Sequence, residues 1–381
     1  MQEEIVIFTD WYVPGYKAGG PIQSVYNLVE LLSKHYHVKV ITRNTDYQSN
    51  KPYSDIVADE WVKVKENQEV FYCSSAKLSI SLIKQFIKLN KDKRILINGL
   101  FSFYFSFLPL LFVVILGVKK SFVAVRGMLH QSALSVKPIK KQIFLAFARG
   151  FGLYKSTVLL STSVQETKEI KMALGGKVNI QLIKNIPLVV KDLNISEKHF
   201  KNENNQLKIL FLGRISEEKN AHILVDALQN YPLPIKVVFC GAYVNQVYFN
   251  EFEKKLNQLP NHIQYQYIND LPHQQIETLF FNSDILVLPS LGENFGHAIF
   301  ESFAFATPVI IGNNTPWKNI EEKQIGIEIN PNRTDELIQA IRFFHELSPS
   351  EYLVWQNNAY QFAKTYFNSN NFEELYLNLF S

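Results

Sequence analysis

The sequence alternates short apolar runs with longer helical segments, and it does so twice. In the first half the apolar runs are rich in β-branched residues, as in EIVIFTD and HVKVITR. Segments such as PIQSVYNLVELLSKHY separate them and have apolar residues at helical spacing. Because near-continuous apolar strands that alternate with helices form parallel sheets, we expect a sheet covered on both faces. The predicted strands lie at 4–10, 37–43, 69–73, 94–100, 121–127 and 157–163, and the predicted helices at 21–36, 79–89 and 140–151.

A second series follows a polar, Asn-rich stretch, KDLNISEKHFKNENNQ, which we interpret as an inter-domain linker. Its predicted strands lie at 207–216, 235–241, 262–270, 284–290, 308–314 and 326–330, and its predicted helices at 220–230, 252–259, 274–282, 297–306 and 334–347. The segment from about Tyr352 to the end looks helical, with an interruption at 368–371. We therefore predict an α/β fold with two tandem Rossmann-like, doubly wound domains that face each other across a cleft.

The predicted domains are 1–192, which would bind an acceptor, and 193–365, which would bind a donor, while 366–381 would return to the first domain. Ligands of doubly wound sheets bind beyond the carboxyl ends of the strands. We therefore look for a site in the loops that follow the strands.

Composition places the chain among ordinary globular proteins. Its 381 residues are 47% hydrophobic and 19% charged, enough for two domains with cores of their own. The net charge of +4, without a dense basic block, argues against nucleic acid and fits a substrate with a few phosphates or an anionic membrane surface. Cys73 and Cys240 both end apolar runs, which predicts buried thiols in a reducing compartment. Because the N-terminus leads directly into a strand-like run, we expect no signal peptide and a cytoplasmic protein.

One segment between two predicted strands is apolar enough to suggest a membrane. Residues 100–118 read LFSFYFSFLPLLFVVILGV, nineteen residues without a charge, close to the ~20 residues that a spanning helix needs. A span here would place neighbouring strands of one sheet on opposite sides of the bilayer. We therefore predict a buried crossover helix that is broken or shifted at Pro109. A helix dipped into a membrane surface and a true span are the alternatives.

The loop after the first predicted strand is rich in glycine. TDWYVPGYKAGGPIQS contains Gly15, Gly19 and Gly20 just before a predicted helix. A glycine loop at a helix N-terminus presents backbone N–H groups that can bind an anion. The alternative is a tight turn between strand and helix, and neither the dinucleotide fingerprint G-x-G-x-x-G nor a P-loop occurs in the sequence.

The loop after the first strand of the second domain contains two cations. In LKILFLGRISEEKN, Gly213 and Arg214 end the strand and Lys219 precedes the helix. An arginine as a planar fork and a lysine as a point charge could clamp a diphosphate. The alternative is a solvated turn in which Glu217 and Glu218 pair with these cations locally.

The stretch GENFGHAIFE follows the fourth strand of the second domain. Glu293 would lie in the loop, Gly296 would let the backbone approach a ligand, and residues 297–299 would begin a helix with open N–H groups. Glu301 would lie about one turn into that helix, where its carboxylate could accept hydrogen bonds from a vicinal diol. The alternatives are a helix-capping acid for Glu293 and a surface acid for Glu301.

The sequence does not suggest a metal site. No two aspartates are separated by a single residue, and the nine histidines lack zinc-type spacing. We expect side-chain cations and helix termini, rather than a metal, to neutralise a bound diphosphate.

These motifs resemble those of retaining glycosyltransferase family four. GENFGHAIFE and the following SFAFATPVI are similar to the family's E-x7-E signature and its A-x-G-x-P-V segment. GRISEEKN resembles the family's G-R-x3-x-K loop, and YKAGGPIQSVYNLVELL resembles its N-terminal glycine loop. The similarities occur in both halves and in the family's order. They imply a GT-B fold, with a nucleotide-sugar donor held mainly by the C-terminal domain and an acceptor by the N-terminal domain.

By motif position, the resemblance implies that Arg214 and Lys219 hold the donor diphosphate, that Glu293 meets the donor sugar and that Glu301 binds the ribose hydroxyls. The residues expected to bind the donor are Gly19, Gly20, Gly213, Phe295, Gly296, His297, Ala298 and Glu301. The family transfers the sugar with retention of anomeric configuration and without a divalent metal, and the leaving diphosphate takes the acceptor proton. No cofactor is expected beyond the donor substrate, a UDP-sugar or a GDP-sugar.

Two departures from the family pattern bear on the site. Ala306 and Thr307 stand where the family commonly has a glycine before Pro308. VRGMLHQSAL lies where many members have a histidine near the sugar, and its local pattern is different. Arg126 and His130 are therefore candidate catalytic residues, with a structural salt bridge or a core role as the alternative.

A basic cluster suggests contact with a membrane. Lys137, Lys140 and Lys141 precede the apolar stretch 143–151 and could touch anionic lipid at the inner face of the cell membrane. The alternative is a solvated helix face. Membrane contact would suit a lipid-linked saccharide acceptor, and the YKAGGPIQS and RGML segments resemble bacterial polysaccharide enzymes, which implies a role in capsule or lipopolysaccharide synthesis.

Three functions remain open on the sequence alone. The first is a retaining glycosyltransferase that acts on a glycan or lipid-linked saccharide. A GT-B sugar-nucleotide epimerase would need acids and histidines from both domains around the sugar. A non-catalytic two-domain binding protein is the third.

Overall fold

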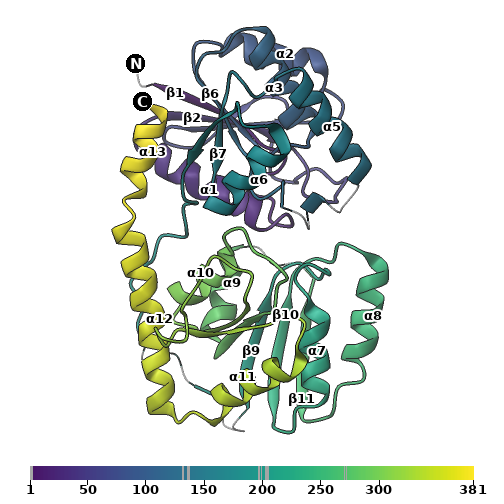
Figure 1. Cartoon of the computed structure of the whole chain (residues 1–381), viewed down its shortest axis with the longest axis vertical. Helices are drawn as coiled ribbons and strands as arrows, with labels where there is room; N and C mark the ends of the chain where they lie inside the picture. The colour runs from purple at the N-terminus through teal and green to yellow at the C-terminus, as the bar shows by residue number, and fades with distance from the viewer. Residues whose placement is uncertain are drawn as a thin grey trace. The chain divides into compact units, whose positions relative to one another are not determined.

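The computed structural model describes residues 3–130, 133–134, 138–195, 198, 200–201, 206–269, 271 and 273–381. The chain divides into two compact units, Met1–Ile186 with Asn371–Ser381, and Pro187–Asn370 (Figure 1). The predicted boundaries lay at 192/193 and 365/366, and the contacts place them after 186 and after 370. Each unit is a Rossmann-like domain built on a mainly parallel sheet, so the predicted α/β fold class is confirmed.

The first unit contains an eight-stranded sheet of order β3-β4-β2-β1-β5-β6-β7-β8. Its strands are β1 (Glu4–Phe8), β2 (His37–Arg43), β3 (Trp61–Lys65), β4 (Gln68–Cys73), β5 (Arg94–Asn98), β6 (Ser121–Ala124), β7 (Val158–Ser161) and β8 (Asn179–Leu182). All neighbours are parallel except β3, which pairs with β4 in the antiparallel sense. The predicted strands do pair in parallel, and the antiparallel edge strand β3 was not among them.

Helices of the first unit connect these strands. They are α1 (Gly20–Leu32), α2 (Ile80–Leu89), the π-helix η1 (Phe103–Phe107), α3 (Leu108–Ile115), α5 (Pro138–Gly150), α6 (Val164–Leu174) and the C-terminal α13 (Phe372–Phe380). The sequence analysis missed β3, β8 and α6. The two strands lie at the sheet edges, where most of their side chains are exposed, so they lack the continuous apolar run that marks a central strand.

The apolar segment 100–118 forms two short helices rather than one long one. The π-helix η1 runs directly into α3, with Pro109 in the first turn of α3, where its missing N–H costs nothing. Most of α3 is buried against the sheet and α2. The predicted break at Pro109 and the buried crossover are thus confirmed. Among the described residues, none of the helices combines the length and apolarity that a bilayer span requires.

The second unit contains a six-stranded parallel sheet of order β11-β10-β9-β12-β13-β14. Its strands are β9 (Leu207–Leu212), β10 (Ile235–Cys240), β11 (Ile263–Ile268), β12 (Ile285–Leu288), β13 (Val309–Gly312) and β14 (Gly326–Ile329). The strand order reverses between β9 and β12, which pair side by side through Ile209 and Leu210. In doubly wound sheets this reversal is the topological switch point, where ligands bind.

Helices of the second unit are α7 (Ala221–Gln229), α8 (Gln246–Leu256), α9 (His273–Phe281), α10 (His297–Ala304), α11 (Thr334–Glu346) and α12 (Pro349–Ser369). All were predicted, and the interruption at 368–371 separates α12 from α13 as expected. Asn371 adopts a left-handed conformation and caps α13 by accepting from Glu374 N. The C-terminal segment then returns to the first unit, where α13 packs on α1 and Phe380 packs on Phe122.

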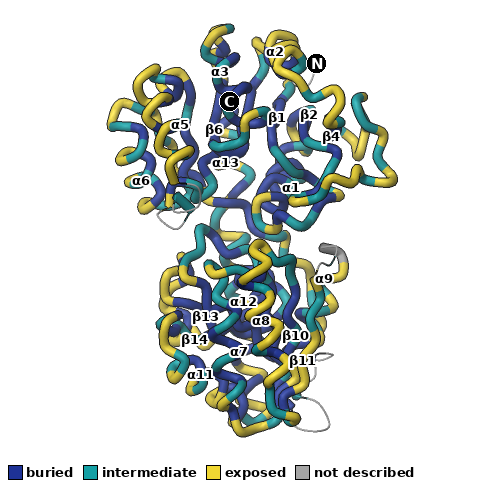
Figure 2. The backbone as a smooth tube through the Cα atoms, turned by 90° about the vertical axis from the view of Figure 1, so that its right-hand side faces the viewer, coloured by how far each residue is buried: buried dark blue, intermediate teal, exposed yellow. Residues whose placement is uncertain are grey.

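Each sheet lies between its helices as a buried layer. In Figure 2 the central strands are coloured as buried, while the outward sides of the helices are exposed. The cores are aromatic as well as aliphatic, with Phe211, Phe239 and Phe252 packed edge to face or tilted beneath the second sheet. Both cysteines are buried thiols outside any disulfide, as predicted.

Candidate active site

Two loops meet at the switch point of the second sheet, one after β9 and one after β12. Gly213 ends β9 and donates its N–H to Cys240 O at 2.9 Å. A Cβ on Gly241, whose φ is +146°, would lie 2.1 Å from Gly213 O, so only glycine permits this approach. The stem of Lys219 lies against Gly213, within 3.7 Å of the point where a Cβ would stand. The loop therefore directs Lys219 across the end of β9.

Lys219 forms an ion pair with Glu293. Its Nζ lies 2.6 Å from Glu293 Oε1, and the two side chains are only 16% and 7% exposed. Ser290, fully buried at the end of β12, donates its hydroxyl to the same oxygen at 2.7 Å. A Cβ on Gly312 would come within 2.2 Å of Ser290 O, so β13 also approaches closely. Glu293 is thus a buried carboxylate fixed by two donors, and not the helix cap considered as an alternative.

Arg214 has a looser partner. Its Nη2 lies 3.4 Å from Glu218 Oε2, and both side chains are more than one third exposed. This is the local pairing considered as an alternative for the loop, and it applies to Arg214 but not to Lys219. An exposed pair of this kind contributes at most about 1 kcal/mol. The guanidinium can therefore exchange Glu218 for another anion at little cost.

The helix α10 begins at His297, and its N-cap Gly296 adopts a left-handed conformation with φ +76° and ψ +65°. A Cβ there would lie 2.8 Å from Ile299 Cδ1, so the turn favours glycine for space as well as for backbone conformation. The N–H of Ile299 donates to Gly296 O at 3.0 Å. The prediction that residues 297–299 all offer open N–H groups is therefore wrong for Ile299.

Aromatic packing fixes the backbone just before α10. Trp317 donates its indole N–H to Phe295 O at 2.6 Å, and the two rings pack edge to face. The ring of His297 lies 4.8 Å from that of Phe295, and His297 and Ala298 are half-buried. Trp317 thus holds the backbone at the start of α10 in place, shortly after Glu293 in the chain.

Glu301 lies one turn into α10, as predicted. Its side chain is buried, with 5% of the residue exposed, so the surface-acid alternative is wrong. A buried carboxylate in the middle of a short helix is costly unless it is paired or hydrogen-bonded. Burial therefore favours a specific role for Glu301 over a solvating one.

In the first unit the glycine loop is held by a carboxylate from the loop after β2. Asp46 accepts from Tyr16 N at 2.9 Å and from Lys17 N at 3.2 Å. Gly19 caps α1 with φ +65°, Gly20 is the first residue of the helix, and no described atom lies within 4 Å of where a Gly19 Cβ would stand. The loop is thus an ordered, open helix N-terminus, and its approach to donor phosphates stays a prediction.

Arg126 and His130 lie beyond the carboxyl end of β6. Arg126, in a left-handed conformation, donates its Nε to Asn98 Oδ1 at 2.9 Å and its Nη1 to Asn185 Oδ1. His130 is half-exposed, with Nε2 4.0 Å from Glu169 Oε1. These contacts give Arg126 a structural partner on two sides, and they leave His130 accessible.

Three further polar residues gather at the carboxyl ends of β1, β2 and β5. Asp10 Oδ1 accepts from Arg43 Nη2 and from Ser102 Oγ, both at 2.8 Å. The sequence analysis did not single them out. The available signal was that Asp10 and Arg43 end predicted strands, in FTD and ITR, and that Ser102 lies just after another, in INGLFS.

Comparison with known proteins bears on the second unit. Residues 193–362 match the model of a family described as glycosyl transferases group 1. This segment of the second unit is therefore similar to that family. It contains the Lys219–Glu293 pair, Arg214, Glu301 and the whole switch point.

Curated glycosyltransferases are similar to this chain over part of their length. The chain is 28% identical over 109 residues to D-inositol 3-phosphate glycosyltransferase of Corynebacterium urealyticum, covering 26% of this chain and 25% of that protein. It is 24% identical over 165 residues to the capsular polysaccharide biosynthesis glycosyltransferase CapM of Staphylococcus aureus, covering 42% and 41%. The matches thus span about a quarter to two fifths of these relatives.

Solved structures share the fold along the whole chain. Sucrose-phosphate synthase from Thermosynechococcus elongatus superimposes with a TM-score of 0.70 at 16% identity, over 99% of both chains. Anabaena Alr3699/HepE, solved in complex with UDP and glucose, gives 0.70 at 14% over 99% and 98%. WaaG, a glycosyltransferase involved in lipopolysaccharide biosynthesis, gives 0.67 at 14% over 99% of both chains. The structural neighbours of the chain are thus GT-B glycosyltransferases, which confirms the predicted fold.

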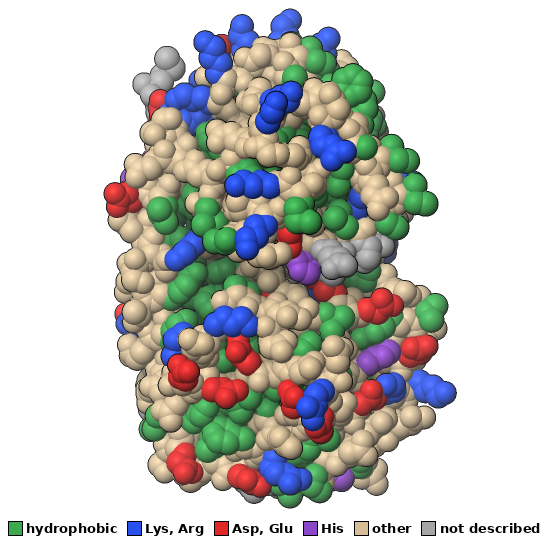
Figure 3. Space-filling model, viewed as in Figure 1, with side chains coloured by type: hydrophobic (Ala, Val, Ile, Leu, Met, Phe, Trp, Pro, Cys, Tyr) green, Lys and Arg blue, Asp and Glu red, His purple; other side chains and the backbone are tan. Residues whose placement is uncertain are grey.

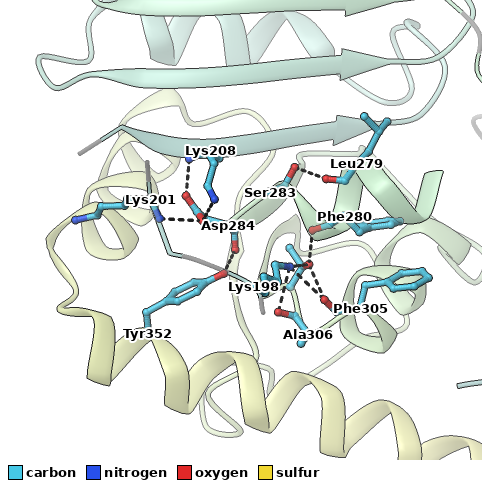
Figure 4. A network of polar contacts seen from close by, with 11 residues as sticks. Lys198, Lys201, Lys208, Leu279, Phe280, Ser283, Asp284, Phe305, Ala306 and Tyr352 are labelled. Atoms are coloured by element: carbon cyan, nitrogen blue, oxygen red, sulfur yellow. Dashed lines mark hydrogen bonds and ion pairs between the residues drawn. The ribbon is translucent and has the colours of Figure 1, made fainter. Parts of the chain in front are cut away.

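The C-terminal end of α10 in the second unit is supported by a buried lysine, which the sequence analysis missed. Ala306 adopts a left-handed conformation with φ +50°, the conformation that a glycine would take there without strain. Lys198 donates its Nζ to Phe305 O at 3.2 Å, to Ala306 O at 3.3 Å and to the hydroxyl of Thr307 (Figure 4). Because helix carbonyls are otherwise unsatisfied at this end, a cation is favourable there.

Burial nevertheless disfavours the charged form of Lys198 and lowers its pKa to about 7. Beside it in Figure 4, the fully buried Asp284 accepts from Lys208 N at 2.7 Å and pairs with Lys208 Nζ at 3.2 Å. Burial raises the pKa of Asp284, and Lys208 opposes the shift. The network joins the segment before β9 to the start of β12 and the end of α10, at the edge of the sheet opposite the Lys219–Glu293 pair.

No group of three or more potential metal-binding side chains occurs among the residues for which the structure gives positions. Of the predicted basic cluster, Lys140 and Lys141 lie on α5, and Lys137 falls outside the described residues. Lys141 Nζ donates to Ala133 O at 2.6 Å and lies over the ring of Phe101.

Proposed function

We propose that the protein is a retaining glycosyltransferase that moves a hexose from a UDP-sugar or GDP-sugar to a glycan or lipid-linked saccharide of a bacterial surface polysaccharide. The observation that carries the proposal is the buried Lys219–Glu293 pair at the switch point of the second sheet, in the segment similar to glycosyl transferases group 1. The pair places a cation and a carboxylate that can accept hydrogen bonds from sugar hydroxyls at the position where a doubly wound sheet binds a ligand.

Each side chain has a role in the proposed reaction. Lys219 and Arg214 bind the two phosphates of the donor, with the arginine as a fork and the lysine as a point charge. Glu293 accepts hydrogen bonds from the donor sugar, and Glu301 accepts them from the ribose. The N-terminus of α10, with Phe295, Gly296, His297 and Ala298, lies along the sugar.

The proposed chemistry conserves atoms and charge without a metal. The bond between the anomeric carbon and the phosphate oxygen breaks, and a bond from the acceptor oxygen to the same face of that carbon forms. The acceptor proton passes to the departing diphosphate. Negative charge grows on the leaving group, so Lys219 and Arg214 stabilise the transition state more than the ground state. Glu293 acts as a positioning group rather than as one of the two carboxylates of a glycosidase.

Two findings support a nucleotide-sugar donor and a surface-polymer acceptor. Anabaena Alr3699/HepE was solved with UDP and glucose and also with UDP-glucose. CapM and WaaG are named for capsule and lipopolysaccharide biosynthesis. In our proposal, the open glycine loop at Gly19 and Gly20 of the first unit meets the donor phosphates. Arg126 and His130 lie near the reacting sugar, and the protein works at the cytoplasmic face of the cell membrane.

The test is turnover of radiolabelled donors by the purified protein. We expect slow hydrolysis of one UDP-sugar or GDP-sugar, activity that survives EDTA, and roughly a hundredfold lower turnover in Lys219→Ala and in Arg214→Ala. Unchanged turnover in both folded variants contradicts the clamp, and loss of activity with EDTA contradicts the metal-free reaction. An epimeric nucleotide sugar as product identifies an epimerase, and binding without turnover identifies a non-catalytic protein.

A further inference from the structure

The charge of the first unit is unevenly distributed along the sequence. Residues 93–165 contain no Asp or Glu, although the whole chain has 35, and they contain ten Lys or Arg. This segment forms β5, η1, α3, β6 and α5, which make one contiguous half of the sheet and its helices. Of its cations, Lys119, Lys120, Lys140, Arg149 and Lys155 are exposed. Glu3 and Glu4 pair with Arg94 and Lys93, whereas the five exposed cations have no acid within the segment itself.

The helix α5 in this segment presents apolar side chains to solvent. Positions four residues apart lie on one face of a helix, and Ile139, Ile143, Phe147 and, just after the helix, Phe151 follow that spacing. They are 71%, 64%, 41% and 72% exposed, whereas Leu145 and Ala148 on the other face are buried. Leu145 and Ala148 pack α5 on the unit, whereas the apolar side chains of the other face are largely open to solvent.

An aromatic row extends this face onto the neighbouring π-helix. The ring of Phe151 lies 4.4 Å from that of Phe147, Phe147 lies 6.3 Å from Phe107, and Phe107 stacks on Phe103 at 5.8 Å. Phe103 is 49% exposed. We call Ile139, Ile143, Phe147, Phe151 and Phe103 the α5 apolar face. In Figure 3 hydrophobic side chains gather at the right-hand edge of the upper part, where Figure 1 labels α5, with Lys and Arg side chains nearby.

We propose that the α5 apolar face is a docking surface for an anionic lipid bilayer. Phenylalanine and isoleucine side chains enter the boundary between headgroups and acyl chains, while the surrounding Lys and Arg side chains meet anionic headgroups. Charge complementarity selects this occupant over a second copy of the chain, because two such faces would bring two sets of exposed cations together. The cations also lie on both sides of the face. Lys140 is in the first turn of α5 and Arg149 in the last, and Lys119, Lys120 and Lys155 precede the neighbouring strands β6 and β7.

The docking surface differs from the membrane segment that the sequence suggested. Most of α3 is buried, and of the segment 100–118 only Phe103 belongs to the α5 apolar face. The proposal goes beyond the proposed transferase activity and does not depend on it, because its readout is binding of lipid rather than turnover.

The experiment is co-sedimentation of the full chain with vesicles. One set contains phosphatidylcholine alone and the other about one third phosphatidylglycerol, in about 0.15 M salt. The apolar variant is Ile139→Ser/Ile143→Ser/Phe151→Ser. Its matched control, Val247→Ser/Phe343→Ser/Leu353→Ser, removes three exposed apolar side chains from the second unit. A charge variant is Lys140→Gln/Arg149→Gln/Lys155→Gln. Because all these side chains are exposed, the variants should fold, and circular dichroism checks this.

We expect the wild type and the control to bind anionic vesicles at least tenfold more tightly than neutral ones. The apolar variant should lose at least tenfold in affinity for anionic vesicles, and the charge variant should lose the preference for anionic lipid. Equal binding of the apolar variant and the wild type overturns the proposal, as does a wild type that ignores anionic vesicles. Sedimentation velocity tests the alternative of a self-interface. A dimeric wild type and a monomeric apolar variant would show that the face joins two copies of the chain, and this result also overturns the proposal.

Discussion

Replacing Glu293 by glutamine should tighten the binding of a nucleoside diphosphate. Lys219 is engaged by Glu293 in the structure, at 2.6 Å and largely shielded from solvent. A diphosphate that binds Lys219 must compete with that carboxylate and also meets its negative charge. Glu293→Gln keeps the size of the side chain and an oxygen that can accept from Ser290, but it removes the charge. The amide should therefore release Lys219 for the ligand.

The magnitude follows from the distance. Two unit charges 2.6 Å apart attract by about 6 kcal/mol at an effective dielectric constant near 20. Desolvation of the two groups cancels most of this attraction, which leaves about 1–2 kcal/mol that a competing anion must overcome. An energy of about 1.4 kcal/mol corresponds to roughly a tenfold change in Kd. We therefore expect the Kd for UDP or GDP, whichever binds the wild type more tightly, to fall about tenfold in Glu293→Gln.

Isothermal titration calorimetry measures this change, with two controls. Glu218→Gln removes the partner of Arg214 from an exposed pair, so it should change Kd by less than about twofold. In a Lys219→Met background, Glu293→Gln should no longer tighten binding, because the competition has no cation to act through. A Glu293→Gln protein that binds the nucleotide equally or more weakly refutes the reasoning. Turnover should still fall in Glu293→Gln, because the donor sugar loses the carboxylate that accepts its hydrogen bonds.

Three further predictions concern the supports of the site. Ser290→Ala should lower turnover about tenfold, while the Kd for the nucleoside diphosphate changes little, because the hydroxyl orients Glu293 for the sugar. Ser290→Thr should restore turnover. Unaltered turnover in Ser290→Ala argues against this role of the hydroxyl. The pKa of Lys198 is lowered to about 7, so the unfolded chain binds one more proton between about pH 7 and 10, and the free energy of unfolding should rise with pH there by at most about 1.4 kcal/mol per pH unit. Urea unfolding of Lys198→Met should lack this rise, and equal slopes in both proteins contradict it. Ala306→Gly should raise the thermal midpoint, because it relieves about 1 kcal/mol of backbone strain, and Gly296→Ala should lower the midpoint by at least as much. Midpoints that shift in the opposite directions contradict backbone strain at these two positions.

Much of the fold could be predicted because parallel sheets have a strong local signal. All twelve predicted strands exist, since buried strands such as β9 and β12 are continuously apolar, and glycines and polar residues mark their ends. The elements that were missed lack that signal. The strand β3 reads WVKVK and pairs at an exposed edge, where only the partner strand and not the sequence selects its antiparallel direction.

The candidate site was predicted in part, for the same physical reason. Gly213, Arg214, Lys219, Glu293, Gly296 and Glu301 could be proposed because each lies just beyond a strand, and the carboxyl ends of parallel strands meet at one edge. Their partners could not be predicted. Residues 219 and 293 are 74 apart in the chain, and nothing local indicates that Lys219 would bind Glu293 rather than Glu217 or Glu218.

The sequence by itself determined the strands, the helices, their order in two domains and the loops that hold the charged residues, because these depend on periodicity and on short-range backbone preferences. Tertiary structure alone decided which charges are neutralised and which apolar faces are covered. It buried Glu293 and Glu301, brought Lys198 from outside the sheet to the end of α10, and buried α3 while leaving the face of α5 exposed. Ion pairing and burial depend on contacts between distant segments, and those contacts exist only after the chain has folded.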